Sequence, residues 1–199
     1  METRYMQMQD VTTRSDENGD LYLEGLFVVY DSVYDVFPGA TESIAKGAFS
    51  ESVNGDVRAL YNHNTDIVLG RTRAGTLELR DTERGLWGRI KINSKDSDAM
   101  NAYARVKRGD LTGCSFGFDI PDGGEETIYK DDGTVHFIIN KVDPLWEVSP
   151  CVFPAYEATH ISARGKDLEK VKDEAKEIQR RRVDAWRAEL KSKLKKERL

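Results

Sequence analysis

Residues 111–118, Leu-Thr-Gly-Cys-Ser-Phe-Gly-Phe, constrain what this chain can fold into more than any other stretch. The run has the composition of a β-strand and carries a hydroxyl among unusually small neighbours. Gly113 and Gly117 allow another backbone to approach the strand closely, as a substrate chain would have to. Two interpretations of Ser115 follow: a serine packed in the core, or a nucleophile.

A serine nucleophile needs a base within hydrogen-bond reach and a third group that orients the base. The chain offers only three histidines, His63, His136 and His160. His63 lies in the polar segment 62–66, directly after the β-favouring run 57–61. Sites are often built where a rigid strand meets an accessible loop, so His63 is the first candidate for the base.

Glu147 lies between Trp146 and Val148 in another β-favouring run. A carboxylate in apolar surroundings costs free energy unless it is paired. Glu147 therefore either alternates outward to solvent on a half-exposed strand or has a buried partner.

Two cysteines, Cys114 and Cys151, are too few for a disulfide framework. No basic-then-apolar leader opens the chain and no apolar run approaches the roughly 18 residues of a membrane helix, so a soluble protein in a reducing cytoplasm is expected. Adjacent strand residues point to opposite faces, so only one of Cys114 and Ser115 can face His63. We expect Cys114 to point into the core; a cysteine hydrolase that uses Cys114 is the alternative.

The charge of the chain is divided unevenly. Residues 164–199 contain 14 Lys and Arg against 8 Asp and Glu, a net +6, and the chain's net −5 less this +6 leaves −11 on residues 1–163. An acidic body argues against nucleic acid as the main ligand, because phosphate binding needs a basic face. No metal-ligand spacing and no phosphate-binding Gly-rich loop is present, so no metal, nucleotide or other cofactor is expected.

The length of 199 residues suits one domain with an appendage. The pattern divides it into a flexible N-terminal segment (1–20), a folded domain (21–163) and a basic helical tail (164–199), amphipathic from Asp167 and built as one helix or two. Within the domain, the spacing of Ala99, Ala102, Tyr103 and Val106 predicts a helix over 97–107 that ends at Gly109. Strands are expected at 21–30, 57–61, 67–72, 77–79, 86–92, 111–118, 135–140 and 145–149, a short helix near Ala48, and a loop or ragged hairpin over 121–133.

Several segments, in order, resemble the prohead (capsid maturation) proteases of tailed phages. They are Gly47-Ala48-Phe49, Tyr61-Asn62-His63 with Leu69-Gly70-Arg71-Thr72, Gly85-Leu86, Gly113-Cys114-Ser115-Phe116-Gly117-Phe118, and Trp146-Glu147-Val148-Ser149 with Pro154-Ala155. The resemblance covers roughly residues 20–160. An ordered set of motifs is far more specific than any one of them.

The resemblance implies a serine endopeptidase related in fold to the herpesvirus assembly proteases. Its fold class would be α+β and mostly β: an antiparallel β-barrel flanked by helices, followed here by the C-terminal amphipathic helix. It implies Ser115 as the nucleophile, His63 as the general base and Glu147 as the third member. The related viral enzymes have a second histidine in that third position, so His136 and His160 compete; Glu147 is preferred because it lies inside a matched segment.

The resemblance also implies the substrate and the place of action. The enzyme would cleave the scaffold, or the scaffolding segment of the major capsid protein, and then itself, inside the assembling prohead in the host cytoplasm. A homodimer is expected by analogy, with neither a membrane nor nucleic acid as partner. The alternative is a non-catalytic scaffold or minor capsid component that assembles through its C-terminal helix.

Overall fold

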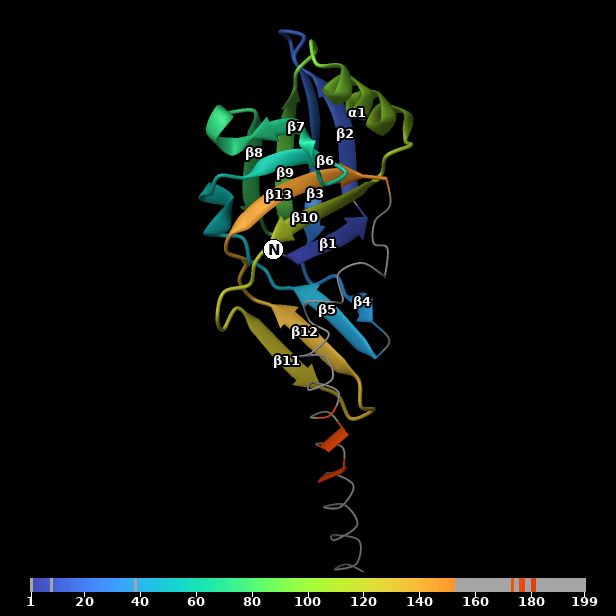
Figure 1. Cartoon of the computed structure of the whole chain (residues 1–199), viewed down its shortest axis with the longest axis vertical. Helices are drawn as coiled ribbons and strands as arrows, with labels where there is room; N and C mark the ends of the chain where they lie inside the picture. The colour runs from blue at the N-terminus through green and yellow to red at the C-terminus, as the bar shows by residue number, and fades with distance from the viewer. Residues whose placement is uncertain are drawn as a thin grey trace, which may run out of the picture.

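The computed structural model describes residues 2–7, 9–37 and 39–152, together with positions 173, 176, 177, 180 and 181. Its strands form three sheets (Figure 1). Sheet A has the order β1 (Glu2–Gln7), β10 (Gly113–Phe118), β13 (Leu145–Cys151), β6 (Arg58–Tyr61) and β7 (Asn64–Arg71). Sheet B has the order β2 (Gln9–Ser15), β3 (Leu21–Val29), β9 (Gly85–Ile92) and β8 (Leu77–Thr82). Sheet C has the order β11 (Glu125–Tyr129), β12 (Val135–Ile139), β5 (Ala40–Ile44) and β4 (Tyr34–Phe37).

The predicted antiparallel β-barrel is not what the described strands form. A barrel closes only when its edge strands pair. The edge strands β7 and β8 are instead separated by a short 3₁₀ helix, η2 (Thr72–Ala74), and stay in different sheets. Two pairings, β13 with β6 and β12 with β5, are parallel. The mostly β prediction is confirmed, whereas closure is not observed.

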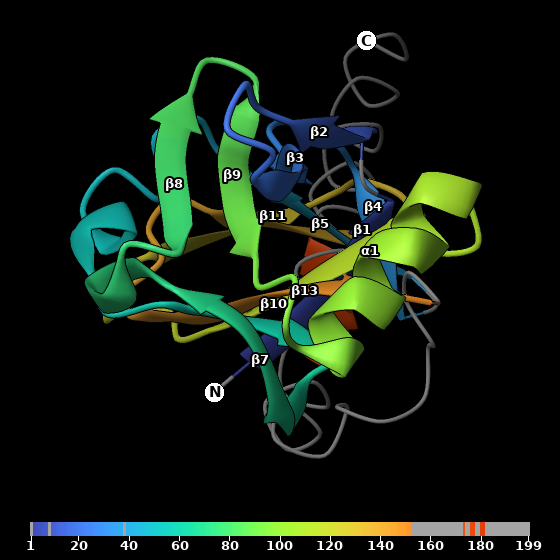
Figure 2. The ribbon, with the colours of Figure 1, turned by 90° about the horizontal axis from the view of Figure 1, so that it is seen from above.

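The main core lies between sheets A and B, whose strands cross steeply when seen from above (Figure 2). Cys114, Phe116 and Phe118 of β10 are fully buried in this core. Phe116 packs edge-on against Phe49, with ring centroids 5.7 Å apart. Because side chains alternate along a strand, Gly113, Ser115 and Gly117 lie on the other side of sheet A, which we call the site face.

The helix α1 (Ser97–Arg108) covers one side of this core (Figure 2). Asp96 caps its first turn by accepting hydrogen bonds from the amides of Asp98 and Ala99, at 2.9 and 3.3 Å. Gly109 ends it in the left-handed conformation, with φ at 84°. The apolar stripe predicted from the sequence is buried, and the predicted helix is confirmed to within one residue.

Other segments differ from expectation. Residues 1–20, predicted as flexible, contain β1 and β2, because edge strands tolerate polar sequences when a neighbouring strand supplies hydrogen-bond partners. The segment 121–133 contains β11, paired with β12. Near Ala48 the chain forms turns and a 3₁₀ helix, η1 (Ser52–Asn54).

The predicted C-terminal helix and His160 fall outside the described residues, apart from the five helical positions between 173 and 181. Across the described part of the chain, no helix has the length and apolar character needed to cross a lipid bilayer.

Candidate active site

His63 lies in a two-residue turn between β6 and β7. Tyr61 pairs with Asn64 across this turn, and the two central residues, Asn62 and His63, have φ values of 54° and 60°. Positive φ at both central positions defines the type I′ turn, whose twist matches that of the two strands it joins. Asparagine is favoured in such a turn and histidine is tolerated, which explains why Asn-His can close this hairpin.

Hydrogen bonds to β13 hold the turn in place. The amide of Asn62 donates to the carbonyl of Pro150 at 3.0 Å. The amide of His63 donates to the hydroxyl of Ser149 at 3.3 Å. A residue in a left-handed conformation is strained, and these contacts fix its orientation.

The imidazole of His63 contacts the carboxylate of Glu147, with 2.8 Å between Nδ1 and Oε1. The hydroxyl of Ser149 donates to Oε2 of Glu147 at 2.5 Å. Because an ionised carboxylate only accepts hydrogen bonds, Nδ1 carries the ring proton and Nε2 is left as the basic nitrogen. Nε2 is shielded from solvent.

Glu147 is buried, with 4% of its surface exposed. Of the two interpretations that the sequence allowed, the one with a buried partner is therefore observed. Both carboxylate oxygens are hydrogen-bonded, one to the imidazole and one to a hydroxyl. This pairing offsets the free energy lost when the charge leaves water.

Ser115 lies on β10 directly opposite Ser149 of β13. Directly opposite residues of an antiparallel pair present their side chains on the same face, with Cβ atoms about 5 Å apart. Ser149 contacts both His63 and Glu147, so the three residues predicted for the site share the site face of sheet A. They come from three adjacent strands or their ends: β10, β13 and the β6–β7 turn. Ser115 itself is fully buried.

Cys114 points away from this group, as the alternation along β10 predicts. Its thiol donates to the carbonyl of Phe27 at 2.9 Å, in the core. Burial raises the pKa of Cys114 well above its ordinary value. Burial likewise raises the pKa of Cys151 to about 12. Since the thiolate is the nucleophilic form, neither cysteine has the surroundings of a reactive one.

His136, a competitor for the third position, lies on β12 of sheet C. Its two ring nitrogens contact the hydroxyls of Thr41 and Ser43, at 2.8 and 2.9 Å. Both hydroxyls come from β5, the parallel neighbour of β12. His136 therefore belongs to a polar group in another sheet. His160, the other competitor, lies outside the described residues.

Ser149 is the residue that the sequence analysis did not assign to the site. It is fully buried, binds the carboxylate of Glu147 and accepts from the amide of His63. The available signal was its spacing, since residues i and i+2 of a strand lie on the same face. Any polar residue two positions from Glu147 was thus a candidate to support it. Among the described residues, no group of His, Cys, Asp and Glu is arranged to hold a metal ion.

A hydroxyl, an imidazole and a buried carboxylate on one sheet face are the groups that serine hydrolases combine. Residues 9–174 match the family model described as Caudovirus prohead serine protease. The chain belongs to this family, and the matched residues make up most of its length.

The known proteins that are similar to the chain include two phage proteases. The prohead protease of Enterobacteria phage HK97 is 29% identical over 147 residues, which are 70% of this chain and 60% of that protein. The chain thus spans less than two thirds of the length of this relative. The structure of the bacteriophage T4 capsid assembly protease, gp21, covers 77% of this chain and all of its own at 14% identity, with a TM-score of 0.44. A TM-score below 0.5 does not establish a shared fold.

Proposed function

We propose that the chain is a serine endopeptidase that cleaves scaffold or capsid-protein scaffolding segments, and finally itself, during maturation of a phage prohead. The observation that carries the proposal is the hydrogen bond between His63 and the buried Glu147 on the sheet face that also bears Ser115. Membership of the prohead protease family supports the capsid protein or scaffold as the substrate. The enzyme would act within the assembling prohead, and the homodimer remains part of the proposal.

In the proposed mechanism, the hydroxyl of Ser115 attacks a backbone carbonyl while Nε2 of His63 takes its proton. His63 then gives this proton to the leaving amine. Each such transfer accelerates the reaction by about 100 to 10,000-fold. Glu147 holds the ring in the productive tautomer and offsets the charge of the imidazolium. Water completes the reaction by attacking the acyl-enzyme, with His63 again as the base.

The burial of Ser115 bears on when this chemistry can occur. The hydroxyl of Ser115 has no exposed surface, so it cannot reach the carbonyl of a peptide in solution. The proposal therefore includes a rearrangement that uncovers the site face before cleavage. Such a step suits a protease that must stay inactive until its substrate has assembled.

The test is co-expression with the capsid protein of the same phage, followed by intact mass measurement. The wild-type chain is expected to shorten the capsid protein or its scaffold, and Ser115→Ala to abolish this while the protein stays folded. Ser52→Ala is the matched control, because Ser52 is also a buried serine but lies in η1 and donates to the carbonyl of Phe49. Unchanged processing by Ser115→Ala would refute the proposal.

The same experiment tests the alternative that the protein is a non-catalytic scaffold or minor capsid component. That alternative predicts that neither the wild type nor any variant alters the mass of the capsid protein. It also predicts no labelling of Ser115 by a serine-directed fluorophosphonate under any condition.

A further inference from the structure

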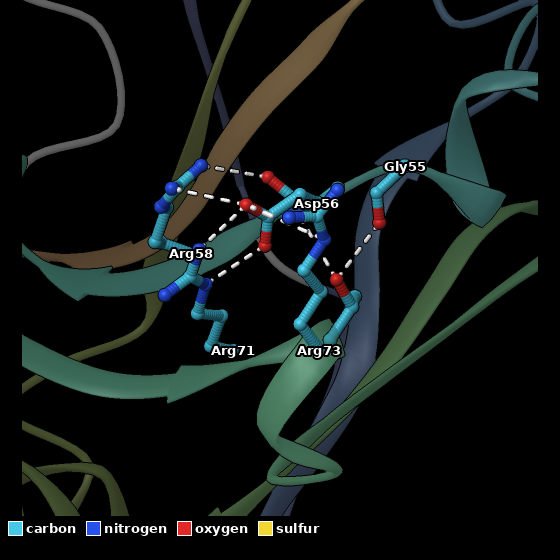
Figure 3. A network of polar contacts seen from close by, with 7 residues as sticks. Gly55, Asp56, Arg58, Arg71 and Arg73 are labelled. Carbon is cyan, nitrogen blue, oxygen red and sulfur yellow. Dashed lines mark hydrogen bonds and ion pairs between the residues drawn. The ribbon is translucent and has the colours of Figure 1, made fainter.

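Three arginines surround the single carboxylate of Asp56, just before β6 (Figure 3). Arg71 donates to both carboxylate oxygens, at 2.8 and 2.7 Å. Arg58 lies 3.1 Å from Oδ2 and also donates to the backbone carbonyl of Asp56 at 2.8 Å. Arg73 is the most distant, 3.8 Å from the same oxygen. We call these four residues the arginine cluster.

The arginine cluster contains more positive charge than Asp56 can neutralise. Within the part of the chain that the structure describes, Asp56 is the only carboxylate within ion-pair distance of these three arginines. Three guanidinium groups against one carboxylate leave a surplus of two positive charges. Residues 1–163 carry a net negative charge, so the arginine cluster is a locally positive site within an acidic part of the chain.

The surplus is available at the surface. The side chains of Arg58 and Arg73 are 38% and 75% exposed, whereas that of Asp56 is 20% exposed. Arg71 alone already gives Asp56 a two-point ion pair, which is the strongest arrangement for these two groups. Arg58 and Arg73 therefore add charge that the ion pair between Asp56 and Arg71 does not require.

Strand register places the arginine cluster next to the candidate active site. Arg58 is the partner of Glu147 across the parallel pair of β6 and β13, and Arg71 is the partner of Arg58 across β6 and β7. Paired residues of neighbouring strands present their side chains on the same face, with the strands about 4.8 Å apart. Arg58 and Arg71 thus continue the site face beyond Glu147, and Arg73, in η2, lies beside them against Asp56.

Ser115 is buried, so an extended peptide can lie along this face only after the rearrangement that the proposed function includes. On β10 the only side chain that projects to the site face between Gly113 and Gly117 is that of Ser115. A peptide that reaches the uncovered face with its scissile carbonyl at Ser115 would extend toward Arg58. Guanidinium groups bind carboxylates through paired hydrogen bonds, which lysine cannot do in the same geometry.

We propose that Arg58 and Arg73 form a subsite that selects an aspartate or glutamate side chain of the peptide substrate. The inference rests on the proposed endopeptidase function and adds a substrate preference to it. Asp56 and Arg71 hold the subsite in place: they fix Arg58 from one side and leave the outer guanidinium surfaces to the substrate. Discrimination of about 10-fold or more between a glutamate and a glutamine is expected from charge-assisted hydrogen bonds.

The test compares peptides that tile the scaffolding segment of the capsid protein and differ only by Glu, Gln or Lys at one position at a time. The measured quantity is the ratio of kcat/KM for the Glu and Gln peptides, which a general loss of activity leaves unaltered. The wild type is expected to prefer Glu by about 10-fold at one position. Arg58→Gln should reduce this ratio, and Arg73→Glu should favour Lys over Glu at the same position.

The matched control is Arg80→Glu, because Arg80 is also exposed and ion-paired with a nearby carboxylate, that of Glu78, but lies on sheet B. Its Glu to Gln ratio should equal that of the wild type. Binding of the same peptides to Ser115→Ala, followed by fluorescence anisotropy, gives a second measurement that needs no turnover.

The outcomes separate the two proposals. Cleavage that depends on Ser115 but ignores charge at every position overturns the subsite and leaves the endopeptidase standing. Absence of any Ser115-dependent cleavage overturns the endopeptidase. In that case equal binding, or no binding, of the Glu and Gln peptides to Ser115→Ala overturns the subsite as well.

Discussion

At the scale of single residues, the pairing of Glu147 is the feature with the sharpest consequence. Its two oxygens are held by His63 and Ser149, so its orientation is fixed. In the proposed mechanism this carboxylate acts on the imidazole beside it. Replacement of the charge without loss of volume should therefore affect catalysis far more than folding.

We expect Glu147→Gln to lower kcat by about 100 to 10,000-fold, because an amide no longer fixes the ring tautomer or offsets the imidazolium charge. Thermal unfolding should still be cooperative, since glutamine retains hydrogen-bonding groups for Nδ1 and for the hydroxyl of Ser149. Glu126→Gln, an exposed position on β11, is the control and should match the wild type in both measurements. Activity within threefold of wild type in Glu147→Gln would show that another group orients His63.

The sequence pointed to the candidate residues of the site, whose catalytic roles stay predictions, but not to the residue that supports them. Ser115, His63 and Glu147 were recognisable from a strand with small residues, a histidine after a strand and a carboxylate in apolar company. Ser149 was not assigned, because a serine in a strand carries no signal until the face it shares with a carboxylate is known. The arginine cluster was equally hidden, since Arg58 and Arg71 become neighbours only through the register of β6 and β7.

At the scale of elements, the turn that carries His63 depends on an unusual backbone conformation. Asn62 has φ at 54°, which asparagine and glycine adopt far more readily than β-branched residues. The turn also fixes the direction of the His63 ring through the contacts of its two amides with β13. Stability and activity should thus be linked at this position.

We expect Asn62→Val to lower the free energy of unfolding by about 1–3 kcal/mol, and Asn62→Gly to change it by much less. Chemical unfolding with urea measures both. Asn101→Val is the matched control: Asn101 is exposed on α1, where asparagine and valine have similar helix propensities. An equal loss in Asn62→Val and Asn101→Val would mean that the left-handed conformation is not what the substitution disturbs.

The Asp56 ion pairs join the start of β6 to the end of β7 and give stability a defined pH dependence. Hydrogen bonding to Arg71, with the charges of Arg58 and Arg73, lowers the pKa of Asp56 from 3.8 to about 2. A carboxyl whose pKa is lower in the folded protein stabilises it above the unfolded value, and this contribution is lost as the pH falls through the folded value. The relevant window is therefore between about pH 4 and pH 2.

Asp56→Asn should lower the Tm at pH 7, and its difference from the wild type should shrink as the pH falls from 4 to 2. Thermal unfolding at half-unit steps of pH measures this difference. Asp122→Asn, an exposed loop position, should show no comparable convergence. If the Tm difference between Asp56→Asn and the wild type stays constant down to pH 2, the charge of Asp56 is not what stabilises the protein.

Elements were predicted more reliably from the sequence than their arrangement. The hairpin of β8 and β9 and the helix α1 follow from local patterns, namely a turn of polar residues and an apolar spacing of three and four. The three separate sheets do not follow from any local pattern. Their separation depends on η2 between β7 and β8, and on the parallel pairing of strands far apart in the chain, such as β13 with β6.

At the scale of the whole molecule, charge and family membership divide the chain at nearly the same place. The family match ends at residue 174, and residues 175–199 contain 10 Lys and Arg against 4 Asp and Glu, a net +6. The remaining residues, 1–174, carry −11. The basic segment thus lies beyond the residues that the family model matches, and we propose that it attaches the protein to scaffold or capsid protein.

We expect deletion of residues 175–199 to leave Ser115-dependent cleavage of a peptide within about threefold of the full chain, and to reduce incorporation into proheads when the scaffold or capsid protein offers an acidic surface. A full-length chain with these Lys and Arg residues replaced by Gln is the matched control, because it keeps the length and removes the charge. Both variants should be lost from purified proheads, and raising the salt concentration during assembly should reduce incorporation of the wild type, since exposed charges are screened beyond about 10 Å at 0.1 M salt. If the Gln-substituted chain is incorporated as efficiently as the wild type, the attraction is not electrostatic. If the deletion abolishes peptide cleavage, residues 175–199 belong to the catalytic domain and the division at residue 174 is wrong.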